Sequence, residues 1–589
     1  MSQPVTTEPP PTLEMLYLDL DSCDPCREGR DSVDETAERV SATLSAVGRS
    51  LEVRVVPVSD VDQARALGLA SSPSVRLNGQ EVALGLDERR RSSCSLRADE
   101  RVACRTFGWA GGRHPYPRAE MIADAVQRHL TGRSAAPEIV EPRSAVRGAV
   151  LVAGDAGWDD GRGVFNSRLD QRPEVVVVPE SVSDVVAAVR FAAANSMQIV
   201  PQRTGHNAEP LGSLEGTILL RTDRMRGVRI NPARRRVRVE AGAKWGDVVP
   251  RASELGLAAL HGSTPDVSVA GYAMGGGVGW YGRKLGLAAN SIIAFEIVTA
   301  DGRSRYVDQH HDAELFWALR GGGGNFGVVT ALDIQLYDIP EVYAGVLFFP
   351  WERSSEVLHA WRDWTATVPD EVTSVGRILQ FPPLPDVPAP LRGQNFAVVE
   401  AVVIGDADRG AELLDPIRAL GPAIDTFAMV PPAGIAELHM DPPDPLPYVG
   451  DGQMLGDLPA AAIDAFVEVA GPGSGSPLLS AEIRHLGGAL ARPQDHHGAL
   501  ASLDASFLTF GVGPTVDEQT YRVNRERLEL LASALAPYDT GRQYLNFTEV
   551  TTDPARFYTP ETYRRLRAAK AEFDPQNVFR ANHPIPPAA

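Results

Sequence analysis

Apolar and polar residues alternate along two short runs near the N-terminus, Leu13 to Leu20 and Leu51 to Val58. Period-two alternation is the pattern of a half-buried strand. A helical pattern lies between the two runs, from about Ser32 to Val47. We therefore predict an α/β unit over residues 12–132, preceded by a disordered lead at residues 1–11.

The pattern changes after a stretch rich in proline, alanine and polar residues, which predicts a linker at residues 133–155. Beyond it, VVVVP (Val175 to Pro179), a helical pattern from Ser183 to Ala194 and MQIVPQ (Met197 to Gln202) follow one another. This order predicts a strand, a helix and a second strand.

Longer alternating runs, such as Asn395 to Gly405 and Ser506 to Gly513, take over after Pro340 and are separated by amphipathic helices. This arrangement predicts an α+β domain built on an antiparallel sheet. Within it, PPLPDVPAP (Pro382 to Pro390) is a local proline-rich loop.

Composition and charge exclude two classes of function. The chain has 589 residues and a formal net charge of −19, which argues against general binding to nucleic acid. No apolar stretch approaches the roughly 20 residues of a transmembrane helix, and the start, MSQPVTTEPPP, lacks the features of a secretory signal. The four cysteines, Cys23, Cys26, Cys94 and Cys104, all lie near the N-terminus. This distribution fits a reducing cytoplasm better than export, so we expect a cytoplasmic protein that does not bind membranes.

Three glycine-rich stretches dominate the middle of the chain: Gln202 to Ala208, Gly262 to Trp280 and Arg320 to Val329. Exposed backbone N–H groups in such turns bind phosphate, so three of them predict a large phosphate-bearing ligand. The third stretch contains Gly322-x-Gly324-x-x-Gly327, the spacing of a dinucleotide fingerprint. A helix is expected before it and a strand after it, the reverse of the Rossmann arrangement, so we expect no Rossmann site.

Together with two C-terminal motifs, these stretches resemble those of the berberine-bridge-enzyme-like FAD-linked oxidases. The resemblance rests on QRTGH (Gln202 to His206), the Pro265 to Gly279 stretch, LFWALRGGGGNFGVVT (Leu315 to Thr330), YLNF (Tyr544 to Phe547) and FDPQNVFRANHPI (Phe573 to Ile585). It implies a two-part FAD-binding domain of the vanillyl-alcohol-oxidase type at residues 156–340 and 547–589. A substrate domain with an antiparallel sheet is implied between the two parts, at residues 341–546.

The resemblance also implies a covalent bond between His206 and the 8α-methyl carbon of the flavin. Doubly linked members of the family carry a cysteine just before the proline of the second loop, where this chain has Thr264. Because no cysteine follows Cys104, a second, thioether link from this part of the chain cannot form. We therefore predict FAD attached through His206 only.

Positions that match the family indicate which residues contact the flavin, although Asn577 and Asn582 are equally compatible with turns. The predicted cofactor-binding residues are Arg203, Thr204, Gly205, His206, Asn207, Thr264, Pro265, Asp266, Gly271, Gly275, Gly276, Gly279, Gly324, Asn325, Gly327, Val329, Asn546, Asn577 and Asn582. No zinc-helix, phosphate-loop or serine-hydrolase motif is present. We interpret His310-His311 as a solvated helix start and predict no metal site.

Tyr544 is the predicted catalytic base, because the family's tyrosine base lies in this Y-x-N motif. A free phenol has a pKa of about 10 and is a poor base unless a nearby cation or donor lowers it. Arg484 and His485 are candidates for that group, and Glu482 is the next candidate base. The alternative is a tyrosine packed at the domain seam with its hydroxyl satisfied.

Cys23-Asp24-Pro25-Cys26 lies between a predicted strand and a predicted helix, the placement of a thioredoxin-like redox pair. A helix N-terminus would stabilise the Cys23 thiolate. Pro73 resembles the cis-proline that faces such a pair, and the whole segment resembles an α/β thioredoxin-like domain. Three roles stay open for the cysteines: a redox pair, metal or thiol sensing that includes Cys94 and Cys104, or structure alone.

The leading functional hypothesis is an FAD-dependent oxidase acting on a small molecule. It would take a hydride from an alcohol, hemiacetal or related group of a sugar or secondary metabolite and pass the electrons to dioxygen. One alternative is a flavin dehydrogenase with another electron acceptor. Another is a metal- or thiol-responsive binding protein that acts through the N-terminal cysteines.

Overall fold

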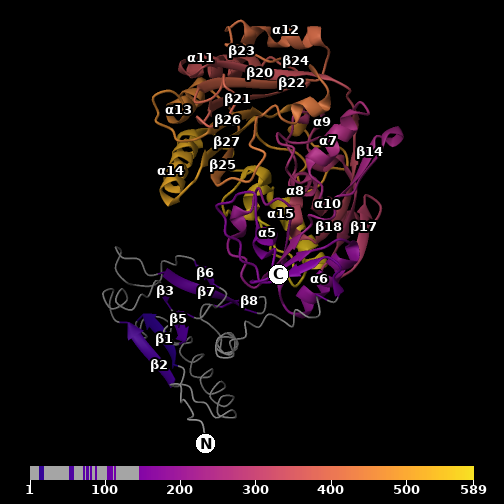
Figure 1. Cartoon of the computed structure of the whole chain (residues 1–589), viewed down its shortest axis with the longest axis vertical. Helices are drawn as coiled ribbons and strands as arrows, with labels where there is room; N and C mark the ends of the chain where they lie inside the picture. The colour runs from indigo at the N-terminus through magenta and orange to yellow at the C-terminus, as the bar shows by residue number, and fades with distance from the viewer. Residues whose placement is uncertain are drawn as a thin grey trace, which may run out of the picture. The chain divides into compact units, whose positions relative to one another are not determined.

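The computed structural model divides the chain into two compact units, residues 1–139 and 140–589 (Figure 1). In the second unit it describes residues 143, 145–385 and 387–588. In the first unit it describes strands only, at residues 12–18, 52–58, 71–72, 74–77, 80–81, 86–88, 103–109 and 112–114.

The N-terminal unit contains a small mixed sheet. Its strand order is β2 (Glu52–Val58), β1 (Thr12–Leu18), β4 (Ser74–Leu77) and β5 (Gln80–Glu81). β1 and β2 pair in parallel, which the long connection between them allows. β4 pairs antiparallel with both β1 and β5. The two strands expected from the alternating runs are therefore present. Cys23, Cys26, Cys94 and Pro73 lie outside the described residues, and the thioredoxin-like interpretation stays a prediction.

The second unit begins with two sheets. The first has the order β11 (Gln198–Gln202), β12 (Thr217–Arg221), β10 (Val175–Val178) and β9 (Ala149–Leu151). The second has the order β13 (Val228–Asn231), β14 (Arg236–Glu240), β18 (Val328–Gln335), β16 (Ile292–Val298) and β17 (Ser304–Asp308). The predicted helix between β10 and β11 is α6 (Val182–Ala194). A helix, α10 (Ala313–Gly322), precedes the third glycine stretch and β18 follows it, as the sequence predicted.

The prediction of a linker at residues 133–155 is wrong for the C-terminal end of this range. β9 lies inside this range and pairs antiparallel with β10. The buried Asp184 of α6 accepts hydrogen bonds from the backbone N–H groups of Arg147 and Gly148, which fixes the approach to β9. A three-residue strand is too short to produce a visible alternation, so only its partner strand reveals it.

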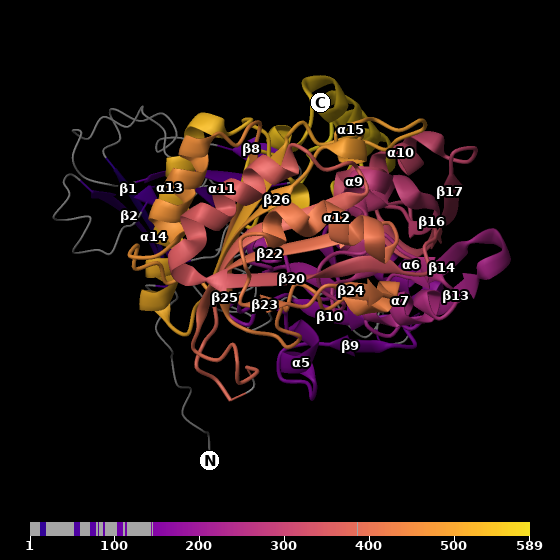
Figure 2. The ribbon, with the colours of Figure 1, turned by 90° about the horizontal axis from the view of Figure 1, so that it is seen from above.

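A third, larger sheet lies within residues 341–546, the range predicted as the substrate domain. Its order is β23 (Ile424–Asp425), β20 (Val342–Pro350), β22 (Asn395–Val403), β21 (Val372–Gln380), β26 (Ser480–His485), β27 (Phe507–Pro514) and β25 (Tyr448–Leu455), with β24 (Ala428–Val430) on β20. All of its pairings are antiparallel. The helices α11 (Ser354–Thr365), α12 (Ala407–Arg418), α13 (Ala460–Ala470) and α14 (Glu518–Leu535) lie over one face (Figure 2).

Side chains alternate across this sheet, as the two-residue period of a strand requires. On β26, Ala481 and Ile483 enter the core beneath the helices. Glu482 and Arg484 point to the opposite face, where they line a cavity. One strand therefore supplies both the packing of the domain and its polar chemistry.

The chain returns to the first domain at its C-terminal end. After α15 (Pro560–Phe573), the Ile199 N–H of β11 donates to the Val578 carbonyl at 2.7 Å, and the Arg580 N–H donates to the Ile199 carbonyl at 2.9 Å. The segment thus adds to the edge of the first sheet and brings residues 580–582 to the cavity.

In the part of the chain that the structure describes, no helix is both long enough and apolar enough to cross a bilayer. Among the same residues, no group of three or more His, Cys, Asp or Glu side chains is arranged so that it could hold a metal ion.

Candidate active site

A cavity of about 1000 Å³ lies between the glycine-rich stretches of the second unit and the helix-free face of the large sheet. Its walls include all three glycine-rich stretches, the C-terminal return and strands β21, β26 and β27. This volume is at the upper end for a small-molecule site and suits a ligand of dinucleotide size.

Most of the residues predicted to bind the cofactor line this cavity. They are Arg203, Thr204, Gly205, His206, Asn207, Thr264, Pro265, Gly271, Gly275, Gly324, Gly327, Val329, Asn546 and Asn582. The cavity lining does not include Asp266, Gly276, Gly279, Asn325, Asn577 or Tyr544.

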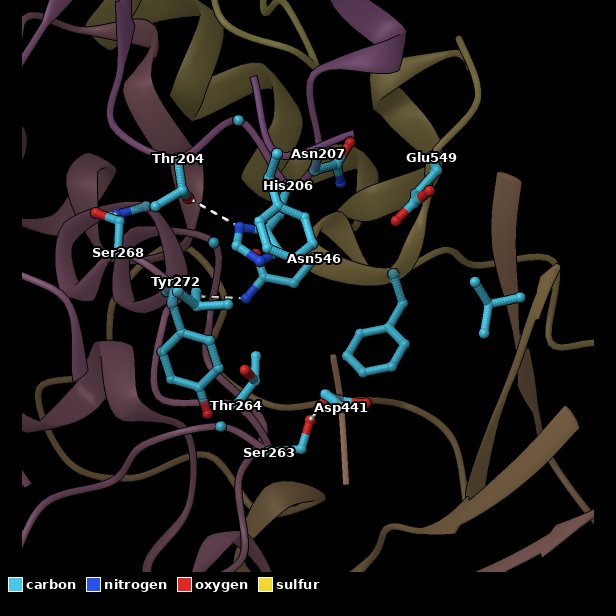
Figure 3. A pocket seen from close by; sticks show the side chains of 18 of the residues that line it. Thr204, His206, Asn207, Ser263, Thr264, Ser268, Tyr272, Asp441, Asn546 and Glu549 are labelled. Carbon is cyan, nitrogen blue, oxygen red and sulfur yellow. Dashed lines mark hydrogen bonds between the residues drawn. The ribbon is translucent and has the colours of Figure 1, made fainter. Parts of the chain in front are cut away.

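The His206 side chain is held in one orientation (Figure 3). Its Nδ1 lies 2.9 Å from Thr204 Oγ1, and its ring stacks on Phe165 with the centroids 3.7 Å apart. Its Nε2 lies 3.4 Å from Asp266 Oδ2 and has no hydrogen-bond partner among the described residues, although it is buried. The imidazole therefore presents one nitrogen that the protein itself does not satisfy.

Asp266 lies beside this histidine and is absent from the cavity lining. Burial raises the pKa of its carboxyl, but the neighbouring His206 and the Thr264 hydroxyl outweigh burial and lower it. Thr264 Oγ1 donates to Asp266 Oδ1 at 2.7 Å. Asp266 is thus an ionised neighbour of the free imidazole nitrogen.

Five charged side chains, which we call the polar island, occupy the sheet face of the cavity: Arg377, Glu400, His439, Glu482 and Arg484. His439 lies between two carboxylates, with Nδ1 2.5 Å from Glu400 Oε2 and Nε2 2.7 Å from Glu482 Oε2. Arg377 donates to Glu400 at 2.7 Å, and Arg484 donates to Glu482 at 2.6 Å. All members except Glu400, which lies behind them, line the cavity.

The charged residues of the polar island shift one another's pKa values and so set their protonation states. Burial and Arg377 lower the pKa of His439, but Glu400, Glu482 and Asp441 outweigh them and raise it to about 9. Burial raises the pKa of Glu482, but Arg484 and His439 lower it well below its usual range. At neutral pH the wall therefore carries an imidazolium beside a carboxylate. Sequence reasoning missed His439, because it lies in a loop without periodicity.

His485, a predicted partner of the base, lies on the other side of β26. Its Nε2 is 2.9 Å from Arg283 Nη1, and its ring stacks on Phe507 of the helix-covered core. Burial and Arg283 lower its pKa to about 3. Of the two candidates, only Arg484 therefore reaches the cavity, because residues 484 and 485 point to opposite faces.

The position of Tyr544 contradicts its predicted role as the base. Its hydroxyl accepts hydrogen bonds from the N–H groups of Gly277 and Val278, at 2.8 and 3.1 Å, and from Asn546 Nδ2 at 3.2 Å. The residue is 2% exposed, and burial raises its pKa well above its usual range. Tyr544 is thus an anchor of the second glycine-rich stretch, packed at the domain seam. Its neighbours Asn546 and Phe547 line the cavity instead.

Glu549 is a further buried acid on the cavity wall, near Asn207 in Figure 3. Its Oε2 has no hydrogen-bond partner among the described residues. The adjacent Asp451 accepts from the N–H groups of Gly452 and Glu549, at 3.0 and 3.3 Å. The two nearby arginines form ion pairs with Glu209, Arg168 at 2.6 Å and Arg525 at 3.7 Å.

Glu549 consequently holds a proton at neutral pH. Burial raises its pKa to about 8, with further contributions from the negative charges of Glu209 and Asp451. Only the three-dimensional arrangement brings these acids together, so nothing in the sequence marked Glu549.

Comparisons with known proteins agree with this architecture. Family models match residues 173–307, described as an FAD binding domain, residues 543–586, described as berberine and berberine like, and residues 12–126, described as a domain of unknown function. The (R)-6-hydroxynicotine oxidase of Paenarthrobacter nicotinovorans is 30% identical over 465 residues, covering 75% of this chain and 97% of that protein. The chain belongs to the berberine-bridge-like FAD-linked oxidases.

Two further relatives show how widely this family's architecture is shared. The chitooligosaccharide oxidase of Gibberella zeae is 25% identical over 472 residues, covering 74% of this chain and 92% of that protein. The crystal structure of 6-hydroxy-D-nicotine oxidase from Arthrobacter nicotinovorans matches with a TM-score of 0.66 and 27% identity. That match covers 77% of this chain and all of that one. This berberine-bridge-like protein is therefore an FAD-linked oxidoreductase.

The residues present fit FAD. The free Nε2 of His206 lies at the cavity, and a Cβ added to Gly324 would meet nothing within 4 Å, so the backbone there is open to a ligand. Arg580 lines the cavity, donates to the Leu211 carbonyl and has no carboxylate partner among the described residues, which suits a pyrophosphate. Arg203, in contrast, is neutralised by Asp223 at 2.8 Å. Sequence reasoning missed Arg580.

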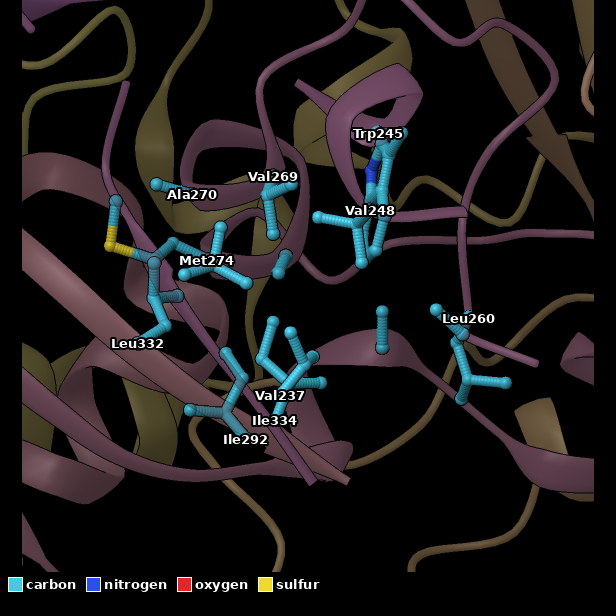
Figure 4. Packing of buried hydrophobic residues seen from close by; sticks show 14 of the residues in the cluster. Val237, Trp245, Val248, Leu260, Val269, Ala270, Met274, Ile292, Leu332 and Ile334 are labelled. Atoms are coloured by element: carbon cyan, nitrogen blue, oxygen red, sulfur yellow. The ribbon is translucent and has the colours of Figure 1, made fainter. Parts of the chain in front are cut away.

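The second glycine-rich stretch is packed onto the main hydrophobic core through the helix α8, Val269–Met274 (Figure 4). Val269, Ala270 and Met274 of α8 join Trp245 and Leu332 in the main core of the domain. The helix is therefore fixed on the sheet, and the loops on either side of it face the cavity.

Four of the residues predicted to contact the cofactor have structural roles. A Cβ on Gly279 would lie 1.9 Å from the His261 carbonyl oxygen, and Gly276 has a φ of +118°. Asn325 donates to the carbonyls of Gly322 and His583, and Asn577 forms a turn with a φ of +53°. These residues shape the loops and the C-terminal return, because close backbone contacts also demand glycine; their contact with the cofactor stays a prediction.

The proton on Glu549 predicts a pH-dependent stability. Its folded pKa of about 8 exceeds its ordinary 4.5, so the folded state keeps the proton to higher pH than the unfolded chain. This stabilisation is full below the unfolded value and is lost as pH rises to about 8, by roughly 1.4 kcal/mol per pH unit. Urea unfolding from pH 5 to 9 should show this loss in the wild type and not in Glu549→Gln.

Glu529→Gln, at an exposed position of α14, is the matched control and should follow the wild type. A difference between wild type and Glu549→Gln that stays constant across this pH range would contradict a proton on Glu549.

Proposed function

We propose that this protein is an oxidase that takes a hydride from a carbon bearing an alcohol, hemiacetal or related group of a sugar or secondary metabolite, with dioxygen as the electron acceptor. The observation that carries the proposal is an ionised, buried carboxylate, Glu482, on the cavity wall opposite the glycine-rich stretches. The curated relatives support it, since they are named as oxidases of hydroxynicotine and of chitooligosaccharide. FAD, when bound, supplies the hydride acceptor.

Glu482 is the group that we propose to accept the substrate proton. As a hydride leaves a carbon that bears a hydroxyl group, that hydroxyl becomes strongly acidic, so even a carboxylate of low pKa can accept its proton. Hydrogen bonds from His439 and Arg484 fix both carboxylate oxygens. These two residues position the base and keep it ionised.

Asp441 and Ser263 join the two domains beside this group. Ser263 Oγ donates to Asp441 Oδ2 at 3.0 Å, and Asp441 Oδ1 lies 4.0 Å from His439 Nε2. Both residues line the cavity (Figure 3). This contact supports a substrate position between the polar island and the second glycine-rich stretch.

We also propose that the flavin is bound covalently, through His206 alone. The fixed imidazole with one free, buried nitrogen supports attachment at this residue. Thr264 stands where a second attachment would need cysteine, and no cysteine follows Cys104.

For the N-terminal unit we propose a thioredoxin-like domain in which Cys23 and Cys26 form a redox pair. The parallel β1 and β2, followed by the antiparallel β4 and β5, support this proposal. The C-x-x-C spacing after β1 supports it as well.

Glu482→Gln should lower the rate constant of flavin reduction by roughly 10²–10⁴ while flavin content is unchanged, because the amide cannot accept the proton. Anaerobic stopped-flow absorbance measures the rate. Tyr544→Phe is the matched control and should reduce at nearly the wild-type rate. The result that would reverse this assignment is slow reduction in Tyr544→Phe and normal reduction in Glu482→Gln.

His206→Ala should remove covalently bound flavin. Yellow fluorescence should stay with the wild-type band on a denaturing gel and be absent from the variant. Thr264→Ala is the control, since a threonine forms no thioether, and its band should still fluoresce. A fluorescent His206→Ala band would rule out attachment through this histidine.

Cys23 and Cys26 should form one disulfide that is broken by dithiothreitol. Thiol titration of the unfolded chain should detect two more free thiols after reduction in the wild type than before. Cys23→Ser/Cys26→Ser should lose this increment. An unchanged thiol count in the wild type would contradict a redox pair.

A further inference from the structure

The proline-rich loop between β21 and β22 forms part of the cavity wall, yet it has no role in the chemistry described above. Six of its described residues line the cavity: Phe381, Pro382, Leu384, Val387, Pro388 and Leu391. None of these side chains carries a hydrogen-bonding group. We call these six residues the apolar wall.

Packing and a backbone hydrogen bond hold the apolar wall in place. Phe381 and Leu391 pack on a separate core cluster that includes Phe348 and Phe396. The Phe381 N–H donates to the Gln394 carbonyl at 3.0 Å, which closes the loop at its base. Prolines restrict the backbone further, so the wall is rigid before any ligand arrives.

Arg392 ties the two sides of this loop together. Its Nη2 donates to the carbonyls of Pro385 and Val387, at 2.6 and 2.9 Å, and its Nε donates to the Val387 carbonyl at 3.1 Å. These two carbonyl groups are therefore already engaged. Because both carbonyl groups already accept hydrogen bonds from Arg392, this part of the loop offers fewer hydrogen-bonding groups to a ligand.

The apolar surface continues on a second loop and on the sheet. Met440, Pro442, Pro443 and Leu446, from the loop that follows His439, also line the cavity. On the sheet itself, Leu379, Phe510 and Val512 do the same. The polar island, together with Asp441 and Ser263 beside it, is thus flanked by apolar surface.

We propose that the apolar wall binds a hydrocarbon ring system of the substrate, while the oxidised carbon and its polar group lie at Glu482. This inference rests on the proposed function. It narrows the proposed substrate class to apolar alcohols and argues against oligosaccharides. An oligosaccharide carries a hydroxyl group on most ring carbons, and each one buried without a partner costs about 1–3 kcal/mol. A hydrocarbon ring, in contrast, is stabilised by about 25 cal/mol for each Å² that it buries.

Equilibrium binding to the oxidised holoenzyme tests the inference without relying on turnover. The probes are 2-naphthalenemethanol and cellobiose, each titrated anaerobically against the flavin absorbance spectrum at 4 °C, in the Glu482→Gln background so that flavin reduction is slow compared with binding. We expect 2-naphthalenemethanol to bind at least tenfold more tightly than cellobiose. Equal binding of the two probes, or tighter binding of cellobiose, would overturn the proposal.

Leu384→Asp locates the binding surface. Leu384 is 56% exposed, so the substitution leaves the core intact, and it should weaken 2-naphthalenemethanol binding by roughly tenfold. Leu530→Asp, at a residue that is 50% exposed on α14 and absent from the cavity lining, should bind as the wild type does. Unchanged binding in Leu384→Asp would show that the wall does not contact the ligand.

Hydrogen peroxide release distinguishes a failure of this inference from a failure of the proposed function. Turnover of cellobiose with little turnover of 2-naphthalenemethanol keeps the oxidase and overturns the apolar substrate. If 2-naphthalenemethanol binds tightly at the wall and neither compound releases peroxide, the binding inference holds, and the proposed oxidation of such alcohols fails.

Discussion

Lys570 and Asp574 form an ion pair, with Nζ and Oδ2 2.5 Å apart, in which both side chains are completely buried. The ammonium also donates to the carbonyls of Asn325 and Phe579, at 2.7 and 3.0 Å. The carboxylate in turn accepts from the N–H groups of Val578 and Phe579. A buried pair of this kind is costly to break, by about 3–5 kcal/mol, because the remaining charge would be left without a partner. It connects the third glycine-rich stretch to the C-terminal return, so both walls of the cofactor cavity depend on it.

The substrate side of the cavity depends on the alternation of a single strand. β26 buries Ala481 and Ile483 under helices and turns Glu482 and Arg484 towards the cavity. The same alternation on β21 presents Arg377 and Leu379 on the cavity side. The position of the charges is therefore set by the register of the sheet, and a one-residue slip would exchange them with the core.

The sequence predicted the parts of this structure that follow from local patterns. β10, α6 and β11 lie where their apolar periods placed them, and the loop around His206 lines the cavity with its neighbours. What could not be predicted depends on distant partners. The Y-x-N motif was found, but the direction of the Tyr544 hydroxyl is decided by the N–H groups of Gly277 and Val278. Likewise, the proton on Glu549 depends on Asp451 and Glu209, which are remote in the sequence.

The C-terminal return also sets an order of events in the life of the molecule. The cavity combines residues 203–207 with residues 580–582. The ribosome therefore synthesises one wall of the cavity long before the other. A ribosome releases the N-terminal parts first, and domains fold as they emerge. The substrate sheet can therefore form before the cavity exists, whereas the cofactor pocket is completed only after residues 580–582 have been synthesised. In this order of folding, the cofactor binds after the sheet has formed, because one wall of its pocket arrives last.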